Sequence, residues 1–235
     1  MKKELLIFGA YGALGNEVAK ILIGKEFNEI YLFGSHRDGK TKIERQNVQN
    51  IQAQDLSIEK NVVEAFNHII PDSDKTLFLF STIGGYTGGK FLWETDESDL
   101  EKMLNINLKT NFLLAKYFSR LVKECSGGSI CFTSAYTGFH AESKKIAYGI
   151  SKSALNILVK TLAIEGKEIN LSVNAIAPYI IDTPVNRQWM KSANYNNWIK
   201  PYEIGELIYS LFNNFNFISG NIIELKERFE AITPD

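Results

Sequence analysis

Short apolar segments alternate along this chain with longer amphipathic stretches, and this pattern limits the fold more than any other feature. The apolar segments lack a strict polar–apolar alternation, which is typical of strands buried on both faces of a parallel sheet. We predict strands at residues 5–8, 30–33, 76–81, 129–133, 171–177 and 222–225, with a weaker strand before Asp55. Helices are predicted over residues 12–24, 58–70, 97–124, 145–167 and 202–213. This order predicts an α/β fold: a doubly wound parallel sheet of about seven strands with helices on both faces.

No linker, repeat or low-complexity segment divides the 235 residues. We therefore predict a single domain over residues 1–235. The segments 36–50 and 178–200 show no clear period and are expected to be irregular.

Composition and charge argue against several classes of function. The chain has 26 Lys and Arg against 27 Asp and Glu, so it lacks the basic excess of nucleic-acid-binding proteins. No apolar run reaches the roughly 18–20 residues of a membrane-spanning helix, and the run after Met1 is too short for a secretory signal. Cys125 and Cys131 form neither a disulfide framework nor a metal-ligand spacing. We expect a cytoplasmic protein with no metal, membrane or nucleic-acid partner.

A glycine-rich turn, Gly9-Ala10-Tyr11-Gly12-Ala13-Leu14-Gly15, joins the first predicted strand to the first predicted helix. Glycine permits a tight turn and a close approach of the backbone to a pyrophosphate. The start of the following helix offers free N–H groups and a positive dipole. We therefore predict a dinucleotide site with contacts from Gly9, Tyr11, Gly12, Ala13, Leu14 and Gly15. A tightly packed helix start without a ligand is the alternative interpretation.

The end of the second predicted strand favours NADP(H) over NAD(H). An acidic residue about 20 positions past the glycines would bind the adenosine ribose of NAD. This chain instead has Gly34-Ser35, followed by His36 and Arg37. A small residue with a guanidinium nearby suits a 2′-phosphate, so Ser35 and Arg37 are predicted cofactor contacts. In the alternative interpretation, Arg37 is only a solvated loop charge.

Tyr148 and Lys152 lie four residues apart on a predicted helix, so their side chains share one face. A lysine ammonium favours a neighbouring phenolate, and we expect it to lower the pKa of Tyr148 from about 10. The spacing alone is weak evidence, because Tyr86 and Lys90 repeat it inside a glycine-rich loop.

The order of these motifs resembles that of short-chain dehydrogenases/reductases over nearly the whole chain. Asp55-Leu56, Asn107 and Asn174-Ala175-Ile176-Ala177-Pro178 complete the pattern. The resemblance implies a Rossmann fold and an NAD(P)H-dependent oxidoreductase acting on a small molecule. It implies that Tyr148 donates the proton, with Lys152 and Asn107 as the other catalytic residues. It also implies a homodimer or homotetramer, and further cofactor contacts from Asp55, Leu56, Gly84, Tyr148, Lys152, Ile181 and Thr183.

One family residue is missing. The family usually has a serine thirteen residues before the tyrosine, where this chain has Ala135. Ser134 would point to the opposite face of its strand, so either the serine is absent or the following loop is one residue longer. Alanine here, the glycines of the turn and the loop 84–89 resemble dihydropteridine reductases.

A missing serine has a chemical meaning. Reduction of a simple ketone benefits from a second donor on the developing alkoxide, whereas a conjugated acceptor spreads the charge over its ring. This favours a pteridine or another conjugated carbonyl or quinonoid substrate. The alternative is a catalytically silent NADP(H)-binding sensor or regulatory protein.

The substrate side is predicted from loops that follow the strands. A segment over about 179–200 is expected to act as a substrate loop or lid that orders over bound cofactor. Aromatic residues in these loops either line a flat substrate site or pack in the ordinary way: Tyr86, Tyr136, Phe139, Tyr179, Trp189 and Trp198.

Overall fold

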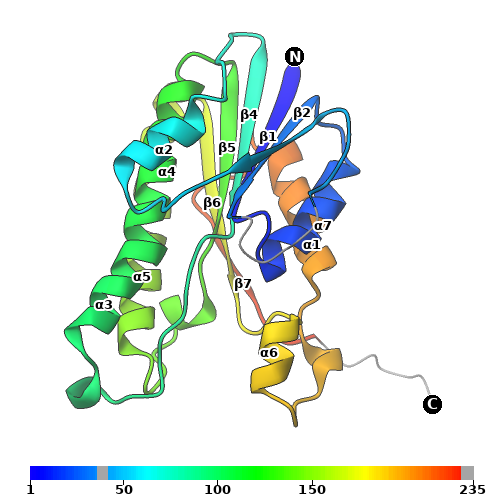
Figure 1. Ribbon diagram of the computed structural model, residues 1–235. Coiled ribbons are helices and arrows are strands. Elements are labelled where there is room, and N and C mark those ends of the chain that lie inside the picture. Colours follow the sequence, from blue (N-terminus) through cyan, green and yellow to red (C-terminus); the bar gives the residue numbers. More distant parts are fainter. Residues whose placement is uncertain (36–41, 229–235) are drawn as a thin grey trace.

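The protein is described here by a computed structural model that covers residues 1–35 and 42–228. Its centre is a seven-stranded sheet in the order β3-β2-β1-β4-β5-β6-β7, and every neighbouring pair of strands is parallel (Figure 1). The strands are β1 (Lys2–Phe8), β2 (Glu29–Gly34), β3 (Val48–Gln52), β4 (Lys75–Ser81), β5 (Gly127–Thr133), β6 (Leu171–Pro178) and β7 (Ile222–Leu225). The predicted doubly wound parallel sheet is confirmed.

Helices cover both faces of the sheet (Figure 1). One face carries α2 (Glu59–Phe66), α4 (Thr110–Val122) and α5 (Ile146–Glu165), which pack with Leu6, Phe8 and Leu79. The other face carries α1 (Ala13–Ile23) and α7 (Pro201–Asn213), which pack with Leu5, Ile7 and Phe80. Because successive residues of a strand point to opposite faces, an uninterrupted apolar strand supplies both cores.

Three segments differ from the sequence prediction. β3 begins at Val48, inside the stretch predicted as a loop, because an edge strand with alternating polar residues lacks the apolar signal of a buried one. The helix predicted over 97–124 is divided into α3 (Glu97–Met103), a π-helical turn (Leu104–Lys109) and α4. The irregular stretch after Pro178 contains a short helix, α6 (Pro184–Trp189), which begins with proline at its first position.

The strand order reverses between β1 and β4, and in open α/β sheets ligands bind at the carboxyl ends of the strands at such a point. Thr82, directly after β4, joins the two strand ends. Its hydroxyl donates to the carbonyl oxygens of Phe8 and Gly9 at 3.2 and 3.0 Å. The glycine turn is therefore fixed at the place where the topology opens a site.

Candidate active site

The glycine turn has the geometry that its sequence predicts. Gly9 has φ = +81°, a conformation that favours glycine. A Cβ atom on Gly15 would lie 2.1 Å from the Gly9 carbonyl oxygen, so α1 packs directly on the turn. The N-cap of α1 is Gly12, with no side-chain cap and no acidic residue in the first turn. Among the described residues, no side chain caps the first N–H groups of α1, and free groups of this kind at a helix start can bind an anion such as a pyrophosphate.

Tyr11 belongs to this turn, but its side chain is buried in the core. The ring covers Gly34 at the end of β2, where a Cβ atom would lie 2.6 Å from Tyr11 Cδ2. The hydroxyl donates to Asn50 Oδ1 at 2.8 Å, and burial raises the pKa of Tyr11 to about 12. Any contact of Tyr11 with a dinucleotide is therefore expected from its backbone.

The residues predicted to contact the adenosine part of the cofactor follow β2 and β3. Ser35 is exposed directly after β2, while Arg37 lies outside the described residues. Leu56 is buried, and Asp55 is exposed with its Oδ1 atom accepting from the Ser57 hydroxyl and backbone N–H at 2.7 and 2.9 Å. These hydrogen bonds lower the pKa of Asp55 and fix the turn before α2.

Tyr148 lies in the first turn of α5 and is partly buried. Its ring meets that of Tyr86 edge-on, with the ring centres 5.1 Å apart. Within the described part of the chain, no group forms a hydrogen bond with the Tyr148 hydroxyl. Burial, with smaller contributions from Tyr86 and Glu142, raises the pKa of Tyr148 above its ordinary value.

Lys152 is one helical turn further along α5 and only 3% exposed. Its ammonium donates to the Thr133 carbonyl oxygen at 2.8 Å and lies 5.9 Å from the centre of the Tyr148 ring. Burial lowers the pKa of Lys152 to about 7. In the protein without a bound cofactor, the expectation that Lys152 lowers the pKa of Tyr148 is wrong, because the pKa of Tyr148 is raised. Both groups are desolvated, and burial favours the neutral form of each.

Asn107 is fully buried in the π-helical turn between α3 and α4. Its Oδ1 accepts from the Gly85 N–H at 2.9 Å, and its Nδ2 donates to the Gly85 carbonyl and the Ser151 hydroxyl, both at 3.0 Å. A Cβ atom on Gly84 would lie 2.8 Å from Asn107 Oδ1 and 3.1 Å from Lys152 Nζ. The structure thus brings Asn107, Gly84, Lys152 and Tyr148 together.

Ser134 and Ala135 follow β5 and lie in different surroundings. The Ser134 hydroxyl is buried and donates to Asn156 Oδ1 at 2.5 Å, while Asn156 Nδ2 donates to the Gly138 carbonyl at 3.2 Å. This network connects the end of β5 with α5. Ala135, also buried, occupies the next position with no hydroxyl to offer.

Asn111, a polar residue outside the sequence prediction, supports this site. Asn111 Oδ1 accepts from the Ser81 hydroxyl at 2.7 Å, and its Nδ2 donates to the carbonyls of Ile83 and Asn107 at 3.2 and 2.9 Å. It therefore fixes both the loop after β4 and the π-helical turn. The spacing of four residues from Asn107 was the available signal for this role.

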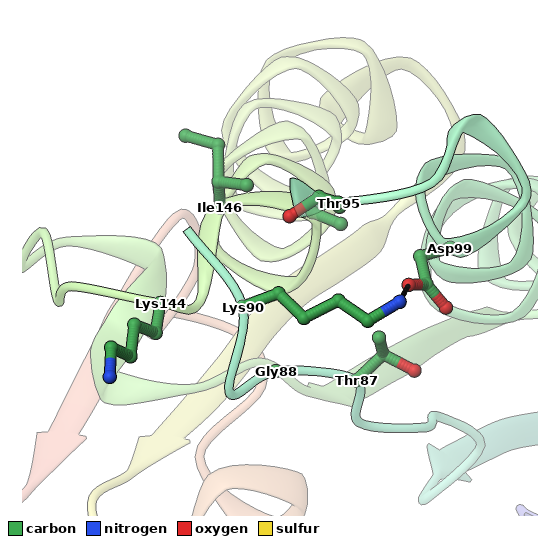
Figure 2. A pocket seen from close by; sticks show the side chains of 8 residues that line it. Thr87, Gly88, Lys90, Thr95, Asp99, Lys144 and Ile146 are labelled. Atoms are coloured by element: carbon green, nitrogen blue, oxygen red, sulfur yellow. Dashed lines mark hydrogen bonds and ion pairs between the residues drawn. The ribbon is translucent and has the colours of Figure 1, made fainter. Parts of the chain in front are cut away.

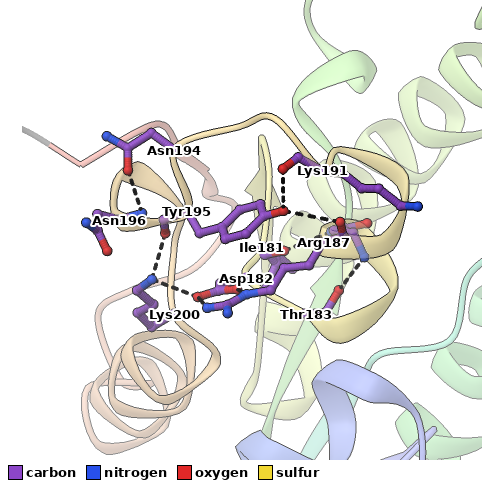
Figure 3. Close-up of polar contacts among 10 residues, drawn as sticks. Ile181, Asp182, Thr183, Arg187, Lys191, Asn194, Tyr195, Asn196 and Lys200 are labelled. Atoms are coloured by element: carbon purple, nitrogen blue, oxygen red, sulfur yellow. Dashed lines mark hydrogen bonds and ion pairs between the residues drawn. The ribbon is translucent and has the colours of Figure 1, made fainter.

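Ile181 and Thr183 follow β6 and are joined to α6. Thr183 Oγ1 accepts from the Asn186 N–H at 3.3 Å as the N-cap of the helix, and Asn186 Nδ2 donates to the Ile181 carbonyl at 2.8 Å. Between them, Asp182 pairs with Arg187 and Lys200 (Figure 3). The segment predicted as a lid is thus bound to the end of β6.

A small cavity of about 170 Å³ lies beside the start of α5 (Figure 2). Residues from the loop after β4, from α3 and from the start of α5 line it: Thr87, Gly88, Lys90, Thr95, Asp99, Lys144, Ile146 and Ala147. Lys90 is paired there with Asp96 and Asp99. Of the aromatic residues considered for the substrate side, Trp198 is only 3% exposed and packs on Tyr195, so it is a packing residue.

The described residues contain neither a metal-ligand cluster nor a membrane-spanning helix. In residues 1–35 and 42–228, no group of three or more His, Cys, Asp and Glu side chains is placed to hold a metal ion. None of the helices in these ranges is long and apolar enough to cross a membrane.

Comparison with known proteins identifies the family. The short chain dehydrogenase family matches residues 3–194, so the chain belongs to this family. It is an NAD(P)-dependent oxidoreductase of the short-chain dehydrogenase/reductase type.

Individual relatives span nearly the whole chain. Dihydropteridine reductase of Dictyostelium discoideum is 27% identical over 99% of this chain and 98% of its own length. Carbonyl reductase family member 4 of Xenopus laevis is 24% identical over 95% of this chain and 96% of its own. Among solved structures, that of ElxO with NADP bound has a TM-score of 0.82 at 25% identity, covering 95% of this chain and 97% of that one.

Proposed function

We propose that this protein is an NADPH-dependent reductase of a pteridine or another conjugated carbonyl or quinonoid compound. Tyr148 is the proton donor, and Lys152 and Asn107 complete the catalytic group. The observation that carries the proposal is the placement of Tyr148 beside buried Lys152, at the carboxyl ends of the strands next to the glycine turn. Among residues 1–35 and 42–228, no group forms a hydrogen bond with the Tyr148 hydroxyl, so it is open to a substrate.

The residues around Tyr148 support a role as an acid. Burial raises the pKa of Tyr148, so the phenol holds its proton near neutral pH. Lys152, with a pKa of about 7, exchanges its proton near neutral pH. Its ammonium donates to the Thr133 carbonyl and would bind the nicotinamide ribose. Asn107 fixes the backbone of Gly85, which orients the loop facing both groups.

A dinucleotide would bind along the carboxyl ends of the strands. The uncapped start of α1 would receive the pyrophosphate, Lys152 the nicotinamide ribose, and Ile181 and Thr183 the nicotinamide end. Bound NADPH supplies the hydride. Preference for NADP(H) over NAD(H) rests on Ser35 and Arg37 and is supported by the likeness to ElxO, whose structures hold NADP and NADPH.

The substrate class rests on the end of β5. Ser134 is engaged by Asn156 and Ala135 has no hydroxyl, so Tyr148 is the side-chain donor for the developing charge. A conjugated acceptor suits a site with one such donor. The near full-length likeness to a dihydropteridine reductase supports a pteridine.

Two assays test this proposal. Purified protein is titrated with NADPH and NADH by fluorescence, and quinonoid dihydropterin reduction is then measured for the wild type and for Tyr148→Phe. We expect tighter NADPH binding, and a loss of turnover of about 10²-fold or more in the variant with nucleotide binding retained. Binding without pterin turnover would move the substrate to other conjugated carbonyl or quinonoid compounds. Equal catalytic efficiency with NADH and NADPH would contradict the cofactor preference inferred from Arg37.

A silent NADP(H) sensor is the second candidate from the sequence. Nothing in the comparisons supports it, and a sensor has no use for the Tyr148, Lys152 and Asn107 set. Nucleotide binding without turnover of any conjugated acceptor would revive it.

Assembly and location are part of the same proposal. The outer face of α5 exposes Ile150, Ile157 and Ile164, and α4 exposes Phe112, as expected for helices that meet a second copy. We expect a homodimer or homotetramer, measurable by light scattering. Cys125 and Cys131 are free thiols, in keeping with a cytoplasmic location.

A further inference from the structure

The carboxylate of Asp182 connects α6 with the start of α7 in the segment after β6 (Figure 3). The Asp182 side chain is 8% exposed and accepts from Arg187 of α6 through both oxygens, at 2.5 and 2.7 Å. Its Oδ2 also accepts from Lys200, at the start of α7, at 2.7 Å. Bidentate and charge-assisted bonds of this kind are the strongest that side chains form.

The contacts continue into the segment between α6 and α7. Lys200 Nζ also donates to the Tyr195 carbonyl at 2.7 Å, and the Arg187 guanidinium lies 4.8 Å from the centre of the Tyr195 ring. The backbone closes the same loop, because the Asp182 N–H donates to the Ile199 carbonyl at 2.8 Å. Every one of these bonds is made within the chain.

We propose that Asp182 is a positioning residue that holds the segment 184–200 closed on the end of β6, so that this segment is formed before a dinucleotide binds. Asp182 stands between Ile181 and Thr183, the two residues assigned to the nicotinamide end. The expected effect on nucleotide binding therefore rests on the proposed function, whereas the closed position of the segment rests only on the contacts of Asp182. The sequence predicts a lid that becomes ordered over bound cofactor, whereas this proposal has the segment already formed in the free protein.

The carboxylate remains charged under working conditions. Hydrogen bonds from Arg187, followed by Lys200, lower the pKa of Asp182 to about 2. A closed segment matters for affinity because the apparent dissociation constant equals the intrinsic one divided by the closed fraction. If loss of the cluster leaves about a tenth of the molecules closed, NADPH binds about tenfold more weakly.

Trp198 reports closure without any nucleotide. It is 3% exposed and packs on Tyr195, with ring centres 4.8 Å apart, whereas Trp93 and Trp189 are 80% and 78% exposed. In a Trp93→Phe, Trp189→Phe background the emission therefore comes from Trp198 alone. We expect Asp182→Asn to shift this emission to the red and to increase its quenching by acrylamide.

A second variant and a control separate closure from general damage. Arg187→Met removes the bidentate pair at a half-exposed residue and should show a smaller change of the same sign. Glu206→Gln removes the exposed ion pair between Lys25 and Glu206, 2.7 Å long, which joins the turn after α1 to α7, and should change neither emission nor quenching.

Nucleotide binding is the second measurement. Asp182→Asn should raise the KM for NADPH about tenfold with a much smaller change in kcat, because only the closed fraction is altered. Unchanged Trp198 emission and quenching in Asp182→Asn would overturn the proposed closure. A wild type that binds neither nucleotide would defeat the proposed function, while the Trp198 experiment would still decide the role of Asp182.

Discussion

Lys152 Nζ lies 5.9 Å from the centre of the Tyr148 ring, and the pKa values of the two side chains shift in opposite directions. Burial raises the pKa of the phenol and lowers that of the ammonium to about 7, because it disfavours the charged form of each. Near neutral pH the pair therefore holds a protonated tyrosine next to a lysine that readily exchanges its proton.

The lowered pKa of Lys152 should appear in the stability of the protein. The unfolded chain holds the lysine proton up to about pH 10.5, while the folded chain releases it near pH 7. Between these values the unfolded state binds more protons, so stability rises with pH. We expect the free energy of unfolding of the wild type, minus that of Lys152→Met, to rise by about 1 kcal/mol per pH unit between pH 7 and 8.5.

Urea denaturation at several pH values measures this difference. Lys160→Met, at an exposed position of the same helix, is the control and should give a difference that does not change with pH. A flat difference for Lys152→Met would mean that Lys152 keeps its proton in the folded protein.

Ser134→Ala should cost stability and leave turnover almost unchanged. The variant leaves the buried Asn156 Oδ1 without its donor, at a cost of about 1–2 kcal/mol in the free energy of unfolding. Chemical denaturation and steady-state kinetics on the same preparation measure both effects. A loss of turnover of about tenfold, well above any effect of stability, would assign Ser134 the role of the family serine.

Ala135→Ser should widen the range of substrates. A hydroxyl at this position adds a donor for a developing alkoxide, which a simple ketone needs more than a conjugated acceptor does. We expect kcat/KM for a plain aliphatic ketone to rise about tenfold, with little change for a quinonoid pterin. Equal improvement for both substrates would contradict the assignment of the substrate class.

Gly12→Ala and Gly15→Ala separate binding from folding at the glycine turn. A Cβ atom on Gly15 would lie 2.1 Å from a backbone oxygen, so this variant should lose about 3 kcal/mol of stability. Gly12 has φ = −68°, and its Cβ atom would meet only the Gly9 carbonyl oxygen at 3.2 Å. This variant should lose less than about 1 kcal/mol.

Nucleotide titration supplies the other half of this comparison. If the pyrophosphate binds at the start of α1 as proposed, a Cβ atom on Gly12, the N-cap of that helix, adds bulk at its site, so NADPH binding should weaken by about tenfold or more. Unchanged affinity in Gly12→Ala would mean that the turn serves packing alone.

Much of the fold could be predicted because it depends on local patterns. Uninterrupted apolar strands such as 76–81 can be buried only between two layers of helices, and this favours a parallel sheet. The edge strand β3 and the helix α6 were harder to predict, since neither has a strong apolar period. The π-helical turn at Asn107 gives no periodic signal of its own.

The sequence by itself determined the glycine turn, the order of the strands and helices, and the spacing of Tyr148 and Lys152, because these depend on neighbouring residues. Only the tertiary structure decided the surroundings of each side chain. The hydrogen bond from Ser134 to Asn156 and the ion pairs of Asp182 with Arg187 and Lys200 form only in the folded chain. Burial in the folded chain is also the main influence on the pKa of Tyr148. Hydrogen-bond partners and desolvation depend on residues far apart in the chain, and no local pattern records them.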